Sequence, residues 1–239
     1  MNASPYTKWT FILNRVNDRE FHSKKWIVGY GFLFWLITRI AMFGVIMLCA
    51  SIYEHFGINP EEMAKFGGDP TMLKNIGSPV FALLFAGLIA PFMEECVFRL
   101  GLSFKRWQVA LGLGSIPVFI VYMTSFFKAS VLQWSIGAAC AAVIILLIFR
   151  FTTDEFWQRA KTKWLVPMMW VTSIAFGLLH VISFSSIPAV MIPYVACMVL
   201  MIFFGGCSIA YLRVNLGFGW GLAMHIFNNL PALAVILAA

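Results

Sequence analysis

The chain has 239 residues, of which 61% are apolar and only 11% are charged, and its formal net charge is +7. A mean hydropathy of +0.86 lies far outside the range of soluble domains and predicts a multi-pass integral membrane protein. The five cysteines stand in apolar stretches without ligand-like spacing, which indicates neither a disulfide framework nor a zinc site.

The N-terminal segment, residues 1–25, is polar and basic, and we expect it to be cytoplasmic or interfacial. The apolar run after it is too long for a removable signal peptide and lacks a small-residue cleavage site. We therefore expect the chain to be retained whole, with residues 26–239 forming one transmembrane domain. Residues 6–21 mix aromatic and basic side chains, so they form either an interfacial helix on the inner surface or a solvated tail.

The apolar stretches after residue 25 are long enough for membrane-spanning helices, each of which needs about 20 mostly apolar residues. The first stretch is long and interrupted by Arg39, so we expect its helix to be tilted or broken. No internal repeat or second domain is evident. The sequence predicts an all-α polytopic bundle of about seven transmembrane helices, at 26–53, 78–103, 107–127, 131–149, 165–184, 188–212 and 217–238.

The basic residues between these spans orient the bundle. With a cytoplasmic N-terminus, twelve of them lie on the inner side and three on the outer side, as the positive-inside rule requires. The net charge then reflects contact with the inner leaflet of the lipid bilayer, and no nucleic-acid partner is expected. The inner residues are Lys8, Arg15, Arg19, Lys24, Lys25, Lys105, Arg106, Arg150, Arg159, Lys161, Lys163 and Arg213; the outer ones are Lys65, Lys74 and Lys128.

Only two of the ten acidic residues, Glu94 and Glu95, lie inside the predicted spans. An ionised side chain near the middle of a bilayer costs roughly 2.5–3.5 kcal/mol, so the charges inside the spans must pair or face a wet cavity. Glu95 and Arg99 are four residues apart, in the favourable acid-first order for an ion pair on one helix face. Glu94 points about 100° away around the same helix. We expect one structural and one free glutamate.

Pro91 lies three residues before Glu94 and has no N–H to donate to the carbonyl of Gly87. This predicts a kink, which a spanning helix tolerates beside a cavity. On this segment alone, an ion pair that holds helices together and a catalytic site remain equally open.

Two of the four histidines, His180 and His225, lie inside predicted spans, and each has a partner on its own helix face, Phe176 and Asn229 respectively, because the spacing is four residues. Such a set suits hydrolysis without a covalent intermediate. Glu94 would take a proton from water, with help from His180. His225 and Asn229 would donate hydrogen bonds to the developing oxyanion. At 1.5 Å per residue, Glu94 and His225 lie about 12–14 Å from the inner face and His180 roughly 20 Å from it.

In this order, the motifs EExxxR (Glu94, Glu95, Arg99), FxxxH (Phe176, His180) and HxxxN (His225, Asn229) resemble the CPBP family of intramembrane glutamate proteases, also called the Abi family, which contains the eukaryotic CAAX prenyl proteases. The resemblance covers the chain from about residue 90 onward. It implies an intramembrane endopeptidase that needs no metal or other cofactor. Glu94 is then the base that activates water, His180 its partner, and His225 with Asn229 the oxyanion side, while Glu95 and Arg99 have supporting positions.

The same resemblance implies that the substrate is a membrane-associated peptide or protein, and the short chain without large loops fits a bacterial inner-membrane member. The chain departs from the family in two ways. Glu94 and His180 are 86 positions apart, so the spans 107–127 and 131–149 intervene and either gate the substrate or fill out the bundle. Leu100 also stands between the motif arginine and the glycine that commonly follows it in the family.

Three alternatives remain open from the sequence. Glu94, His180 and His225 would also make a metal site of two histidines and one carboxylate. Acids and histidines inside a membrane can instead relay ions or protons in a transporter. A catalytically inactive relative would act as an immunity or interaction scaffold.

Overall fold

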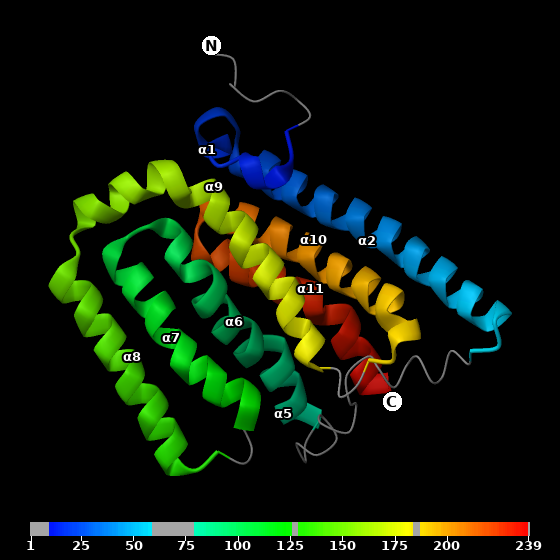
Figure 1. Ribbon diagram of the computed structural model, residues 1–239. Helices are drawn as coiled ribbons and strands as arrows, with labels where there is room; N and C mark the ends of the chain where they lie inside the picture. Colours follow the sequence, from blue (N-terminus) through cyan, green and yellow to red (C-terminus); the bar gives the residue numbers. More distant parts are fainter. Residues whose placement is uncertain (1–9, 59–78, 126–128, 184–186, 239) are drawn as a thin grey trace.

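The computed structural model describes residues 10–58, 79–125, 129–183 and 187–238, and these residues form helices and no strand. Five helices of the described ranges are long and apolar enough to cross a membrane, so the protein is an all-helical, membrane-embedded one. Figure 1 shows the helices packed side by side around α10 and α11. In chain order they are η1 (Ile12–Asn14), α1 (Asp18–Phe21), α2 (Lys24–His55), α5 (Pro79–Leu84), η2 (Phe85–Ile89), α6 (Ala90–Arg99), η3 (Leu100–Ser103), α7 (Arg106–Ser125), α8 (Val131–Phe151), α9 (Asp154–Leu179), η4 (His180–Ser183), η5 (Ala189–Met191), α10 (Ile192–Leu216) and α11 (Phe218–Ala238).

Each of the seven predicted spans corresponds to helix in the part of the chain that the structure describes. Residues 78, 126, 127 and 184 of those spans lie outside that part. The five helices that meet the length and hydropathy criteria are α2, α7, α8, α9 and α10. The predicted span 78–103 coincides with the run of helical elements from α5 to η3, which the π-helix η2 divides. The predicted span 217–238 coincides with α11.

The structure excludes the predicted break in the first span and corrects the start of the fifth. α2 runs without a break through Arg39, because arginine is a good helix former and its guanidinium has a partner on another helix. α9 starts at Asp154 rather than 165. The hydroxyl of Thr153 caps its first turn by accepting a hydrogen bond from the backbone N–H of Phe156, and two acidic residues follow at the positive end of the helix dipole. The apolar run in the sequence therefore predicted only the apolar part of this helix, and the polar first turns were not predicted.

α10 is the centre of the bundle and packs against α2, α9 and α11. Small residues allow the close approach: a Cβ at Gly206 would lie 3.1 Å from both Arg99 and Phe176, and one at Gly31 would lie 3.1 Å from Leu212. α6 lies inside the bundle between α7, α9 and α11, whereas α8 packs against α7 at the edge (Figure 1). The outer faces of α2 and α8 expose large apolar side chains, as lipid-facing helices do.

Residues 10–22 are neither a solvated tail nor a single interfacial helix; they form two short turns packed against α10. Ile12 and Leu13 are fully buried. The hydroxyl of Tyr211 donates to Asp18 at 2.7 Å, and the amide of Asn215 donates to the carbonyl of Arg15 at 2.8 Å. The preceding residues 6–9 lie outside the described part of the chain.

The helix ends that the sequence predicted on one side of the membrane do lie together. The backbone N–H of Arg106 donates to Asp154 at 3.2 Å, and Arg213 donates to Gln108 at 3.0 Å. With the contact between Asn215 and residue 15, these bonds join the N-terminal turns, the start of α7, the start of α9 and the end of α10. Lys8, Lys65, Lys74 and Lys128 lie outside the described residues.

Candidate active site

The helix that carries the two glutamates is preceded by a π-helix, η2. The backbone N–H of Ala90 donates to the carbonyl of Phe85, five residues back, and the next nitrogen belongs to Pro91, which has no hydrogen. The carbonyl of Ala86 therefore has no donor within its own helix. The amide of Asn229, from α11, donates to it at 3.4 Å. The kink expected near Pro91 is thus a wide turn that ties α11 to the segment just before the glutamates.

Glu95 is fully buried and forms the ion pair that the spacing predicted. Nη1 of Arg99 donates to Oε1 of Glu95 at 2.5 Å, and neither side chain is exposed. The guanidinium of Arg99 also lies 4.2 Å from the ring centroid of Phe176, a cation–π contact. The pair is therefore held in place by α6 and α9 and by Gly206 of α10, which lies against Arg99.

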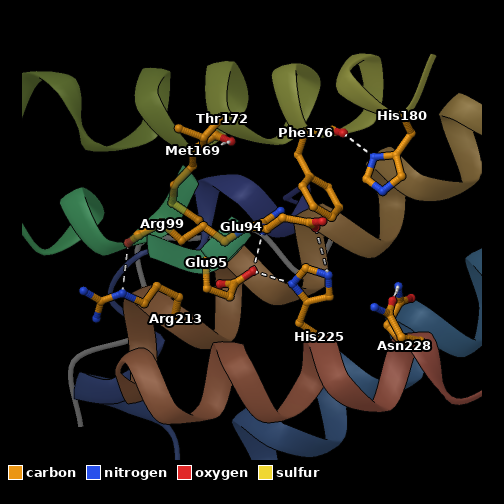
Figure 2. Close-up of polar contacts among 11 residues, drawn as sticks. Glu94, Glu95, Arg99, Met169, Thr172, Phe176, His180, Arg213, His225 and Asn228 are labelled. Atoms are coloured by element: carbon orange, nitrogen blue, oxygen red, sulfur yellow. Dashed lines mark hydrogen bonds and ion pairs between the residues drawn. The ribbon is translucent and has the colours of Figure 1, made fainter. Parts of the chain in front are cut away.

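His225 lies between the two glutamates, as Figure 2 shows. Its Nδ1 is 2.8 Å from Oε1 of Glu95, and its Nε2 is 3.4 Å from Oε2 of Glu94. Because Oε1 of Glu95 already accepts a hydrogen bond from Arg99, Nδ1 of His225 is the donor in the first contact. The order Arg99–Glu95–His225–Glu94 therefore runs from the buried interior to the accessible glutamate.

Exposure separates the two glutamates as the sequence predicted. The side chain of Glu94 is 15% exposed, whereas that of Glu95 is inaccessible. The contact with His225 also places Glu94 and His225 at the same depth, in agreement with the helical rise counted from the sequence. A carboxylate that is both oriented and accessible can accept a proton from a water molecule.

His180 stands where α9 ends, and its ring lies beside Phe176 (Figure 2). Nδ1 is 2.8 Å from the backbone carbonyl of Phe176. A carbonyl only accepts, so Nδ1 carries a hydrogen, and in the neutral ring Nε2 has a lone pair for which the described residues supply no donor. The ring of Phe176 contacts His180 at 4.9 Å and His225 at 5.3 Å between centroids, both edge to face. Within the described residues His180 thus joins the site through this phenyl ring and forms no direct bond to Glu94 or His225.

Asn229 is held by its neighbours on both sides of the amide group. Its oxygen accepts a hydrogen bond from Asn228 at 3.4 Å, while one N–H points to the carbonyl of Ala86. The other N–H of the amide has no acceptor among the described residues. The oxygen of Asn228 in turn accepts from Trp35 Nε1 at 2.8 Å and from the guanidinium of Arg39.

Sequence reasoning missed Trp35, Asn228 and Arg213 as parts of this region. Arg213 was counted as a basic loop residue, but it is buried within α10 and donates to the carbonyls of Arg99 and Leu100, both at 3.0 Å. It thereby satisfies backbone groups at the end of α6. For Asn228, a signal was available: the mid-span charge of Arg39 required a polar partner on another span.

An apolar cavity of about 400 Å³ lies between α6, α7 and α9, and Val97, Leu113 and Trp164 are among its lining residues. The glutamates and histidines of the site do not line it, since it borders another face of α6. Within the described ranges, no group of three or more His, Cys, Asp or Glu side chains is arranged to hold a metal ion.

No family model, no curated protein and no solved structure matches this chain.

Proposed function

We propose that the protein is an intramembrane endopeptidase of the CPBP family, which hydrolyses a peptide bond of a membrane-associated peptide or protein without a metal ion. The observation that carries the proposal is the contact between the accessible Glu94 and His225, whose other nitrogen is fixed by the buried pair of Glu95 and Arg99. An isolated structural ion pair needs no second, accessible glutamate aimed at the same imidazole.

In the proposed mechanism, Glu94 is the general base. It takes a proton from a water molecule as the water oxygen attacks the peptide carbonyl, and it passes that proton to the amide nitrogen as the C–N bond breaks. The products are a carboxylate and an amine. In this mechanism His225 carries a hydrogen on both ring nitrogens: Nε2–H donates to the Glu94 carboxylate and keeps it in position, while Nδ1–H donates to Glu95. Glu95 orients His225 in the way that a buried carboxylate orients the imidazole of a hydrolase triad.

His180 and Asn229 complete the proposed site, one beside the attacking water and the other beside the oxyanion. The lone pair on Nε2 of His180 would accept a hydrogen bond from the attacking water. The free N–H of Asn229 would donate to the oxygen that becomes negative, where one well-aimed donor is worth about 2.7–4 kcal/mol of barrier.

For the protein in the membrane, we propose seven transmembrane helices, a cytoplasmic N-terminus and a bacterial inner membrane as the location. The support is the twelve-to-three bias of basic residues and the shared location of the helix ends predicted on the inner side. In this arrangement, α7 packs against α6, and α8 packs against α7 at the edge of the bundle.

A proton relay is the second candidate, because Glu94, His225 and Glu95 form an uninterrupted carboxylate–imidazole–carboxylate path. Proteoliposomes with a pH-sensitive dye inside would test it. Proton flux that depends on Glu94 and occurs without any peptide cleavage would favour the relay over the protease.

The proposal is tested by profiling the termini of membrane and secreted peptides in cells that carry the wild-type chain, Glu94→Gln or the matched control Glu54→Gln at equal levels. Glu54 is exposed near the end of α2 and has no part in the site. We expect termini that occur with the wild type and with Glu54→Gln and vanish with Glu94→Gln. Identical profiles for all three chains would contradict the proposal.

A further inference from the structure

Arg39 is the only arginine in the middle of α2, and its charge is poorly compensated. One N–H of its guanidinium donates to the oxygen of Asn228, and the group lies 5.8 Å from the ring centroid of Trp35. Its Nε is buried without a hydrogen-bond partner. No Asp or Glu in the described residues forms an ion pair with it.

Such an environment is costly for arginine, which keeps its charge in proteins. A buried donor without an acceptor is destabilising, and a cation inside a bilayer requires a partner or water. Asn228 cannot offer more, because its oxygen already accepts from both Trp35 and Arg39 and its N–H is directed at Asn229. The guanidinium therefore retains unused donors that point to an anion as the missing partner.

The guanidinium of Arg39 packs closely against a glycine of α10. A Cβ at Gly205 would lie 3.1 Å from the oxygen of Asn228 and 3.3 Å from Nη2 of Arg39. Any larger residue would press on this pair. Gly205 thus lets the guanidinium of Arg39 and the oxygen of Asn228 lie close against the backbone of α10, which holds the guanidinium in place.

Position connects this group to the candidate site. Asn228 follows His225 by three residues on α11, which places both on neighbouring positions of one helix face. Figure 2 shows Asn228 about one turn along α11 from His225. Through Asn228 and Asn229, a line of hydrogen bonds runs from Arg39 to the carbonyl of Ala86, in the π-helix that precedes the helix carrying Glu94.

We propose that Arg39, with Asn228 and Gly205, forms a carboxylate-binding subsite that holds an acidic group of the peptide while Glu94 acts on a nearby bond. The proposal rests on the proposed function for the identity of the ligand as a peptide. The carboxylate comes either from the C-terminus of the peptide or from an aspartate or glutamate side chain. Such a subsite would bind peptides that carry a carboxylate at this position more tightly than neutral peptides.

The test measures binding to the full chain in lipid nanodiscs, with Glu94→Gln present to keep peptides intact. The probes are three mixtures of N-acetylated apolar hexapeptides, which end in a free acid, end in an amide, or end in an amide and contain one internal glutamate. Retention of each mixture is quantified by mass spectrometry. We expect at least one carboxylate-bearing mixture to bind tenfold or more tightly than the plain amide mixture, and the better of the two names the source of the carboxylate.

Variants then assign the preference to Arg39. Arg39→Met should abolish it and leave binding of the plain amide mixture unchanged, whereas Arg150→Met, an exposed arginine on α8, should keep it. Equal binding of all three mixtures, or a preference that survives Arg39→Met, would overturn the proposal. Should Arg39→Met fail to fold, Arg39→Gln takes its place, since glutamine keeps a hydrogen-bond donor and removes the charge, and it should likewise lose the preference.

Cleavage of the same mixtures by the chain with Glu94 intact is measured separately. Selective binding without any cleavage would contradict the proposed protease and leave the carboxylate subsite standing. Cleavage that ignores the carboxylate would contradict only the subsite.

Discussion

Replacing Arg99 with methionine tests the buried support of the site without touching Glu94. The change keeps an unbranched apolar stem and removes the charged end of the side chain. Glu95 then stays buried with one donor, Nδ1 of His225, while its Oε2 has no partner even in the wild type. Breaking a buried ion pair from one side costs about 3–5 kcal/mol. The lost cation–π contact with Phe176 adds about 0.5–2 kcal/mol. We expect the free energy of unfolding of Arg99→Met to fall by about 3–5 kcal/mol or slightly more.

The assay is reversible unfolding in mixed micelles, followed by tryptophan fluorescence, for Arg99→Met, Glu95→Gln and the double variant. Each single variant leaves one buried charge unpaired, whereas the double variant removes both charges, so the double variant should recover most of the loss and be more stable than either single variant. Arg150→Met, a matched change on an exposed position, should stay within about 0.5 kcal/mol of the wild type. A loss below about 1 kcal/mol for Arg99→Met, or simple additivity in the double variant, would refute the reasoning.

Three further outcomes follow from the same structure. Gly206→Ala should lower the free energy of unfolding by about 1–3 kcal/mol, because its methyl group would press on Arg99. The control Gly29→Ala meets no atom within 4 Å, so it should leave the free energy of unfolding unchanged or raise it by about 0.5–1 kcal/mol. Unfolding curves measured in parallel compare the two variants. Tyr211→Phe should cost about 1.5–3 kcal/mol in the same assay, since the buried carboxylate of Asp18 loses a hydrogen bond of 2.7 Å, and a neutral result would show that this bond does not hold the N-terminal turns in place. Elemental analysis of purified, active protein should find metal well below one ion per chain, and stoichiometric zinc that is required for cleavage would contradict the metal-independent mechanism.

The fold could be predicted largely from apolar run length. Every predicted span has a helical counterpart in the described residues, because a bilayer forces apolar segments of this length to satisfy their backbone groups internally. The ion pair of Glu95 and Arg99 could also be predicted, since it depends only on spacing within one helix. Helix starts outside the apolar runs, such as Asp154, could not, because caps and polar turns set them.

Contacts between helices in the candidate site could not be predicted from spacing along one helix. Which nitrogen of His225 meets which glutamate depends on how α11 packs against α6, and Asn228 meets Trp35 across 193 positions of the chain. The sequence assigned His180 as the partner of Glu94; in the structure the imidazole in contact with Glu94 is that of His225. The π-helix before Pro91 was not predicted either, because the sequence was read with the four-residue hydrogen-bond spacing of an α-helix.

The most direct measurement of the central claim is the cleavage rate of a peptide identified by terminal profiling, with purified protein in proteoliposomes. The account predicts that Glu94→Gln lowers kcat by about 10²–10⁴-fold, the usual contribution of a general base, and leaves the unfolding curve of the protein unchanged. Glu54→Gln should cleave at the wild-type rate. Cleavage by Glu94→Gln within tenfold of the wild-type rate would contradict the role of Glu94 as the base that activates water.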